Sequence, residues 1–134
     1  MDPTKKAWLR VSAIICLGLI VVGKWAWHMR KQGYLDSIVG RMAAIPAAED
    51  RYARVHPETG YSCQFSELGL GKPSGYEVQI RGCGPSSGEP NRSFQAVARP
   101  LDSELPALCI DQNGPLRYSV DGSTEDCVQR GEYW

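Results

Sequence analysis

The stretch at residues 7–29, AWLRVSAIICLGLIVVGKWAWHM, is the most apolar part of the chain. Its uncharged centre, residues 11–23, is too short by itself to cross a bilayer, whose apolar layer needs roughly 20 helical residues. The flanks supply the missing length, because long basic side chains reach the headgroups and tryptophan rings settle at the membrane boundary. The residues assigned to this interface are Trp8, Arg10, Lys24, Trp25 and Trp27. We therefore predict one membrane-spanning helix.

A cleaved signal peptide is the alternative interpretation of this segment, since it also has a basic start and a short apolar centre. No small-x-small cleavage site follows, because the centre runs into Lys24-Trp25-Ala26-Trp27-His28. A retained anchor is therefore favoured, whereas cleavage would leave a soluble exported domain. The predicted organisation is a cytoplasmic N-terminus at 1–6, a transmembrane helix at 7–29 and a globular domain at 30–134.

The formal charge of the chain is zero, but the charge is unevenly distributed. Residues 1–33 carry a net charge of +5, and residues 34–134 carry a net charge of −5. The acidic domain argues against a nucleic-acid partner, because phosphates require clustered Lys and Arg. The basic N-terminal part suits anionic headgroups, so membrane lipid is an expected partner.

The positive-inside rule does not orient the span, because basic residues flank it nearly equally on its two sides. Cysteine usage instead indicates on which side of the membrane the domain lies. Cys16 falls within the span, and the other four cysteines fall in the domain: Cys63, Cys83, Cys109 and Cys127. An even count in a small domain predicts two disulfides, which persist in an oxidising compartment. Zinc is the alternative, but gaps of 20, 26 and 18 residues differ from the short C-x₂₋₄-C spacing of zinc sites. The domain is therefore expected outside the cytoplasm.

Residues 34–55 show the period of an amphipathic helix. The apolar stripe consists of Leu35, Ile38, Val39, Met42 and Ile45. Pro46 should kink this helix or start a second segment, in which Tyr52 and Val55 point inward. Pro57 and Gly60 should end it.

Beyond residue 60 the pattern changes to that of β-strands. Residues 75–82 alternate apolar and polar side chains, which predicts a half-buried strand. Further strands are predicted at 93–99, 107–111 and 116–120, and a polar loop at 122–126. The expected fold class is α+β, with an amphipathic helix packed on a small antiparallel four-stranded sheet. The C-terminal aromatic residues Tyr133 and Trp134 are candidates for docking on another surface.

This order of elements, with several short motifs, resembles type IV pilins and the pseudopilins of type II secretion. The motifs are residues 48–52 with 59–63 at the helix end and loop, 66–69, 75–78 in the first strand, and 108–119 with Cys127 at the last hairpin. The resemblance implies disulfides from Cys63 to Cys83 and from Cys109 to Cys127, where the residues alone allow three pairings. It also implies a bacterial inner membrane and a periplasmic domain.

The chain departs from pilins at the start of the apolar helix. Pilins carry a glycine followed by Phe-Thr-Leu-Ile-Glu, which a prepilin peptidase cuts and whose glutamate registers subunits in a filament. The equivalent stretch here is Lys6-Ala7-Trp8-Leu9-Arg10-Val11, without that glycine or an acidic residue. We interpret the chain as a pilin-like domain that serves another purpose.

The sequence contains no recognisable catalytic, cofactor or metal motif. The histidines are His28 and His56, and neither has a companion motif such as H-E-x-x-H or G-x-S-x-G. Asp111-x-Asn113-Gly114 has a faint calcium-loop character but is better explained as a turn. We expect no enzyme activity, no cofactor and no small-molecule substrate.

Three functions remain as hypotheses. The favoured one is a structural or accessory subunit of a larger respiratory, photosynthetic or secretory membrane complex, whose other subunits are the expected partners. The second is a minor pseudopilin or pilus component. The third is an enzyme or ligand sensor with a membrane tether.

Overall fold

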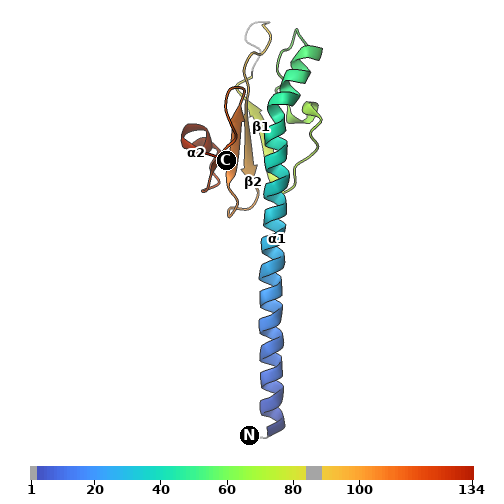
Figure 1. The fold of residues 1–134 in the computed structure, drawn as a ribbon, viewed down its shortest axis with the longest axis vertical. Coiled ribbons are helices and arrows are strands. Elements are labelled where there is room, and N and C mark those ends of the chain that lie inside the picture. Colours follow the sequence, from blue (N-terminus) through green and yellow to red (C-terminus); the bar gives the residue numbers. More distant parts are fainter. Residues whose placement is uncertain (1–2, 84–88) are drawn as a thin grey trace. The chain divides into compact units, whose positions relative to one another are not determined.

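The computed structural model describes residues 3–83 and 89–134, with side chains from residue 12 onward. Its elements are α1 (Pro3–Val55), the 3-10 helix η1 (Phe65–Leu68), β1 (Tyr76–Arg81), β2 (Gln95–Pro100), β3 (Ala107–Asp111), β4 (Arg117–Ser119), α2 (Thr124–Arg130) and β5 (Glu132–Tyr133) (Figure 1). The chain divides into two compact units, Met1–Gly33 and Tyr34–Trp134. The fold is α+β, as the sequence predicts.

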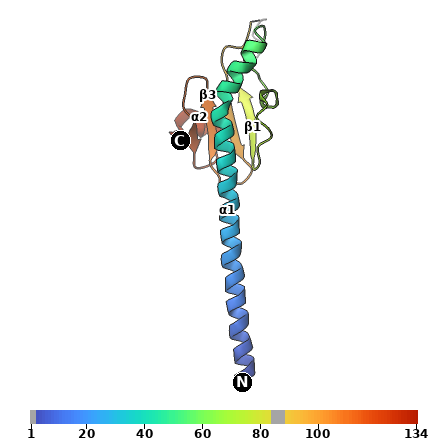
Figure 2. The ribbon, with the colours of Figure 1, turned by 45° about the vertical axis from the view of Figure 1, so that its right-hand side comes forward.

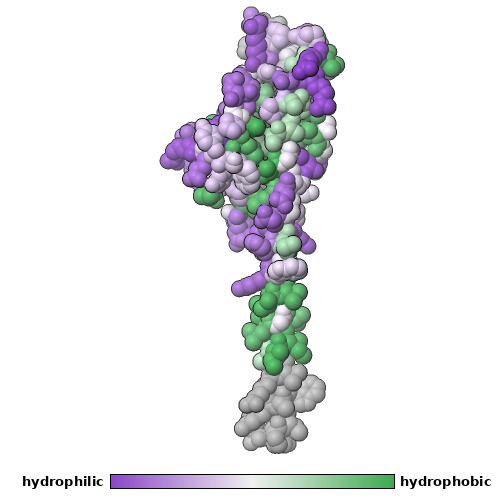
Figure 3. Space-filling model, in the orientation of Figure 1, coloured by the Kyte–Doolittle hydropathy of each residue, from purple (hydrophilic) through white to green (hydrophobic). Residues whose placement is uncertain are grey.

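In the first unit, α1 exposes aliphatic side chains around its circumference. Each of these side chains is more than half exposed: Ile14, Ile15, Leu17, Leu19, Ile20, Val21 and Val22. They form the green band along the helix in Figure 3. Among the described residues, α1 is the one helix long and apolar enough to cross a membrane, which agrees with the predicted span.

In the second unit, the remaining part of α1 packs across one face of the sheet (Figure 2). The helix contributes a buried stripe whose members recur every three or four residues: Ile38, Met42, Ile45 and Ala48. The sheet contributes side chains of one face of β2 and β3: Ala96, Ala98, Leu108 and Ile110. The helix continues through Pro46, so the predicted second segment is not separate.

One inward-facing prediction for this helix is wrong. Val55 was expected in the core, but it is 68% exposed, because α1 ends at this residue and the chain turns away. Tyr52 is half-buried against the core, as expected. The end of the helix before Pro57 agrees with the sequence.

The sheet is antiparallel throughout, and its strands are ordered β1-β2-β3-β4-β5. The four predicted strands are present, with bounds that differ from the prediction by at most two residues. The fifth strand, β5, corrects the predicted count. It has two residues, which is too short to show the alternation by which a strand is recognised in a sequence.

The opposite face of the sheet carries a second, smaller core that α2 covers. Its members are Val97, Ala107, Cys109 and Cys127, with Val128 packed against them. The segment 122–126 was predicted as a loop, but α2 begins within it at Thr124. Ser123 caps this helix, because its Oγ accepts a hydrogen bond of 3.2 Å from the Asp126 N–H.

Replacing Ser123 by alanine is expected to lower the free energy of unfolding by about 1 kcal/mol, since the Asp126 N–H loses its acceptor. Urea unfolding of the detergent-solubilised chain, followed by circular dichroism, measures the change. Ser103→Ala, in an exposed loop, is the matched control and should shift stability by less than ~0.5 kcal/mol. Equal losses in the two variants would contradict the capping role.

Candidate functional site, an aromatic hollow beside β5

The four cysteines predicted to form disulfides are bonded in two pairs in the structure. Cys63 pairs with Cys83, with Cα atoms 5.5 Å apart, and Cys109 pairs with Cys127, with Cα atoms 6.0 Å apart. This is the pairing that the pilin resemblance implies. The first bridge ties the loop after α1 to the segment after β1, and the second ties β3 to α2. Cys16 is free.

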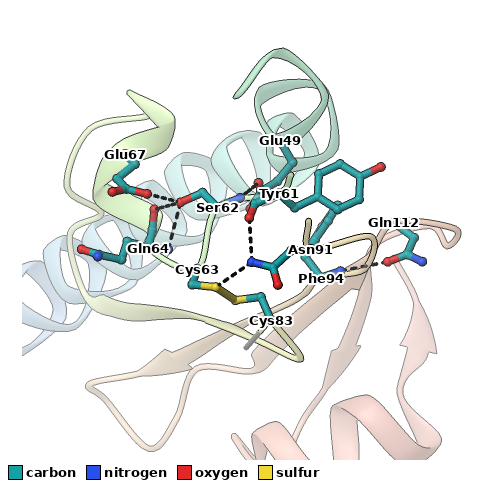
Figure 4. Close-up of a disulfide and its surroundings, with 10 residues drawn as sticks. All are labelled: Glu49, Tyr61, Ser62, Cys63, Gln64, Glu67, Cys83, Asn91, Phe94 and Gln112. Atoms are coloured by element: carbon teal, nitrogen blue, oxygen red, sulfur yellow. Dashed lines mark hydrogen bonds between the residues drawn. A yellow bond between two sulfur atoms is a disulfide. The ribbon is translucent and has the colours of Figure 1, made fainter. Parts of the chain in front are cut away.

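A network of hydrogen bonds connects the Cys63–Cys83 bridge to α1 (Figure 4). The Asn91 side-chain amide donates to the Tyr61 carbonyl at 3.2 Å and to Cys63 Sγ at 3.3 Å. The next residue, Ser62, donates its backbone N–H to Glu49 Oε2 at 2.7 Å. The loop that leaves α1 is therefore tied to the helix by the buried Glu49 side chain, and the Tyr61 hydroxyl donates a further hydrogen bond to Asp50 Oδ1 at 3.3 Å.

Glu49 is fully buried, and its Oε1 has no hydrogen-bond partner among the described residues. Burial raises the pKa of this carboxyl group to about 7, with smaller contributions in the same direction from Glu67 and Asp50; the hydrogen bond from Ser62 opposes the rise. Sequence reasoning missed this residue, although a signal was present. Ile38, Met42, Ile45, Glu49 and Tyr52 are spaced by four, three, four and three residues, so Glu49 occupies a core position of the helix.

The predicted membrane-interface residues lie in the first unit. Lys24, Trp25 and Trp27 are exposed, and Lys31 Nζ lies 5.0 Å from the centre of the Trp27 ring. Trp8 and Arg10 lie outside the residues whose side chains are described. The interface role of all five remains a prediction.

The histidine that belongs to the second unit has a local environment without a catalytic arrangement. His56 stacks on Tyr52 with ring centres 4.5 Å apart, and its Nδ1 lies 4.0 Å from Glu58 Oε1. Among the described residues, no group of three or more His, Cys, Asp or Glu side chains could hold a metal ion. The absence of enzyme activity stays a prediction.

A hollow of about 490 Å³ lies at the β4–β5 end of the sheet, and we call it the aromatic hollow. Its lining residues are Glu104, Pro106, Tyr118, Val120, Tyr133 and Trp134. Because Tyr118 pairs with Glu132 and side chains alternate along a strand, Tyr118, Glu132 and Trp134 lie on the same face of the sheet. Trp134 extends this pairing, since its backbone N–H donates to the Leu116 carbonyl at 2.9 Å.

The two rings of the hollow are fixed relative to one another. Tyr118 and Trp134 meet edge to face, with ring centres 5.5 Å apart. The Tyr118 hydroxyl donates to Glu132 Oε2 at 2.9 Å, and this hydrogen bond raises the pKa of Tyr118. Trp134 lies outside the core that α1 covers.

Three residues that line the aromatic hollow are each more than half exposed. Val120 is 77% exposed, Tyr133 72% and Trp134 55%, and all three line the same hollow. Clustered apolar exposure of this kind marks a binding surface more often than singly scattered apolar residues do. Sequence reasoning identified Tyr133 and Trp134 as a tail that could dock, but not the partners contributed by β4 and the 101–106 loop.

The charged groups around the hollow are mainly acidic. Glu104 lines it, and the Glu132 carboxylate adjoins it through Tyr118. The two arginines of the neighbouring elements have acidic partners: Arg117 bonds to Asp111 at 3.3 Å, and Arg130 to Asp126. The arrangement presents apolar and aromatic side chains with carboxylates beside them.

Comparison of the chain with protein-family models, curated proteins and solved structures gives no match.

Proposed function

We propose that the chain is a non-catalytic, single-pass, pilin-like accessory subunit of a larger membrane complex. In this proposal, α1 anchors the chain and the second unit binds another subunit through the aromatic hollow. The exposure of Val120, Tyr133 and Trp134 around one hollow carries the proposal, because an isolated domain gains nothing from leaving this surface in water. The complex is respiratory, photosynthetic or secretory.

The proposed topology has the N-terminus in the cytoplasm and the second unit in the periplasm of a bacterial inner membrane. The two disulfides support this orientation, because cytoplasmic thiols are kept reduced. Membrane-impermeant thiol labelling of intact cells after reduction should reach Cys63, which is exposed, and Cys83, which is half-buried. Labelling only after the cells are opened would place the domain in the cytoplasm and overturn the topology.

Purification in a mild detergent is expected to yield the chain together with at least one partner at a constant molar ratio. The physical reason is that burying the aromatic hollow removes apolar area from water, so a bound partner stabilises this chain. Quantitative mass spectrometry of the gel-filtration peak measures the ratio. Elution of the chain alone, at the size of a monomer in its micelle, would count against a subunit role.

A minor pseudopilin or pilus component is the second candidate. The observation that favours it is the path of α1, whose first part is apolar and whose later part packs across an antiparallel sheet. N-terminal sequencing of the mature chain decides between the candidates. Removal of a short leader before the span supports the pseudopilin function, whereas an intact N-terminus supports the accessory-subunit function.

A further inference from the structure

We propose that the outer edge of β1 receives an extended segment of the protein partner, which joins the sheet as a further strand. The inference rests on the proposed function, because the segment belongs to another subunit of the complex. It places a second contact at the edge of the sheet opposite the aromatic hollow. Three observations support it: the length and regularity of β1, the backbone groups that β1 leaves unpaired, and a groove beside them.

The two edges of the sheet differ in length. β5 has two residues, so its edge offers little backbone for pairing. β1 (Tyr76–Arg81) has six residues and pairs with β2 in a continuous register (Figure 2). Many proteins block such an edge with a proline, a lysine or a bulge, because it otherwise pairs with another chain. Along its six described residues β1 has none of the three, and its charged side chains, Glu77 and Arg81, already form ion pairs with residues of β2 and α2.

The backbone groups that β1 directs outward follow from its pairing with β2. The Leu101 N–H donates to the Gly75 carbonyl at 3.0 Å, so these two residues form a hydrogen-bonded pair at the start of the antiparallel ladder. Such pairs alternate with pairs whose backbone groups point away from the partner strand. The outward-facing residues are therefore Tyr76, Val78 and Ile80. Within the part of the chain that the structure describes, their N–H and C=O groups have no hydrogen-bond partner.

This row of groups selects an extended polypeptide over a compact ligand. Its first and last residues are four positions apart, which is ~14 Å along a strand. Donors and acceptors recur along it at the spacing of a second backbone, so an added strand satisfies the whole row. A small molecule that fills the same volume reaches only a part of it.

A groove of about 730 Å³ runs along the same edge. The β1 residues that line it are Tyr76, Glu77 and Val78. Tyr76 and Val78 belong to the face that α1 covers, and Glu77, which stands between them, belongs to the other face. A groove that touches both faces follows the edge of the strand. Its opposite wall consists of η1 and the loop after it, in which Phe65 and Pro73 supply apolar surface.

The groove also predicts the side chains of the incoming segment. Residues directly opposite one another in a ladder point to the same face of the sheet. A segment that bonds to the outward groups of β1 therefore places the side chains of its bonded residues beside Val78 and Phe65, on the apolar face. We expect these residues to be apolar and the residues between them, which lie on the face of Glu77, to be polar.

Amide exchange tests the geometry of the edge in the full chain. The ¹⁵N-labelled chain in a dodecyl maltoside micelle is transferred to deuterated buffer and followed by NMR. The amides of Glu77 and Gln79 should exchange slowly, and those of Tyr76, Val78 and Ile80 should exchange faster. Equal protection of the two sets would mean that the edge is already covered and would overturn the proposal. Protection that is lost on dilution would assign the edge to a second copy of the chain and overturn it equally.

Two isomeric peptides test the backbone requirement. Both have the sequence acetyl-Val-Thr-Val-Thr-Val-Thr-amide, and one is N-methylated at its threonines and the other at its valines. With the valine side chains on the apolar face, the valine N–H groups point at β1, and methylation removes them only from the second peptide. We expect saturable shifts and slower exchange at Tyr76, Val78 and Ile80 with the threonine-methylated peptide, and an affinity about tenfold lower for its isomer.

The peptide results that contradict the proposal are equally specific. Equal affinity of the two isomers would show that the groove takes apolar groups without backbone pairing. Signal shifts confined to the aromatic hollow would place the binding elsewhere. Absence of binding by both peptides at millimolar concentration would show that the edge accepts no strand. Each of these results overturns the proposal.

A variant of the opposite wall tests the groove without altering β1. Ser66 is exposed and lines this wall, so Ser66→Trp places an indole in the groove. It should weaken binding of the threonine-methylated peptide about tenfold, because the indole occupies the space of the added strand. Ser93→Trp, an exposed serine outside the groove, is the matched control and should leave the affinity unchanged. A Ser66→Trp chain that binds like the wild type would overturn the groove as the site.

Amide exchange in the purified complex separates failure of this inference from failure of the proposed function. A partner that copurifies with the chain and slows exchange at Tyr76, Val78 and Ile80 supports both. A partner that copurifies while these amides exchange as in the free chain leaves the subunit role standing but overturns the added strand. If no partner copurifies while the threonine-methylated peptide binds as expected, the subunit role fails and the strand-accepting edge stands.

Discussion

Replacing Cys109 and Cys127 together by alanine is expected to lower the free energy of unfolding by about 3 kcal/mol or more. Chain entropy accounts for most of this loss, because a bridge that closes 18 residues raises the free energy of the unfolded chain by about 3 kcal/mol. Packing adds to it, since both cysteines are fully buried against Val97 and Ala107 in the core beneath α2. Alanine is chosen because it leaves no buried hydroxyl behind. Urea unfolding in dodecyl maltoside, followed by near-ultraviolet circular dichroism, measures the loss.

The second bridge provides the comparison that identifies the packing contribution. Cys63 is exposed, and its bridge to Cys83 spans a similar 20 residues, so the entropic part should be nearly the same. We expect the Cys63→Ala, Cys83→Ala variant to lose less, by on the order of 1 kcal/mol. Cys16→Ala, in the span, should leave the unfolding of the domain unchanged. A larger loss for the exposed bridge than for the buried one would refute the packing argument.

The consequences of losing the Cys109–Cys127 bridge extend to the aromatic hollow. The bridge fixes α2 to β3, and β5 follows α2 directly, so the position of Trp134 depends on it. The Arg117 guanidinium also reaches the Val128 carbonyl of α2 at 3.0 Å, which is a second tie between β4 and this helix. The hollow is thus held from both faces of the sheet, since Tyr118 also packs against the core that α1 covers.

The parts of the fold that the sequence predicts are those with a long, regular pattern. The stripe from Ile38 to Ile45 defines the amphipathic helix, and the alternation in residues 75–82 defines β1. By contrast, α2 has seven residues and β5 has two. These segments are too short for the helical period of 3.6 residues or the strand period of two residues to be recognised. The capping pattern of Ser123 and Asp126 was the available signal for α2, and it was interpreted as a polar loop.

The aromatic hollow could not be derived from sequence, because its walls come from three separate segments. Pro106 precedes β3, Tyr118 lies in β4, and Trp134 follows β5, and only the strand pairing brings them together. Glu49 was missed for another reason. It stands beside Asp50 and Arg51 in a charged run, and helical periodicity alone separates the buried member from its exposed neighbours.

Raising the pH is expected to destabilise the second unit through Glu49. The pKa of its carboxyl group is raised from 4.5 to about 7 in the folded chain, so the folded state holds this proton more tightly than the unfolded state does. The contribution of the neutral carboxyl is therefore complete below pH 4.5 and is lost as the pH rises through about 7. The total change across this window is about 3 kcal/mol.

Glu49→Gln should abolish this pH dependence, because the amide is neutral at every pH and its oxygen can still accept the Ser62 N–H bond. At pH 8 the variant should be more stable than the wild type by up to about 3 kcal/mol, and near pH 4.5 the two should be nearly equal. Urea midpoints measured between pH 4 and 9 provide the test. Glu58→Gln, whose side chain is 74% exposed, is the matched control and should retain the wild-type profile. If the urea midpoint of Glu49→Gln changes with pH as much as that of the wild type, another group carries the pH dependence. The Glu49 carboxylate would then be ionised in the folded chain.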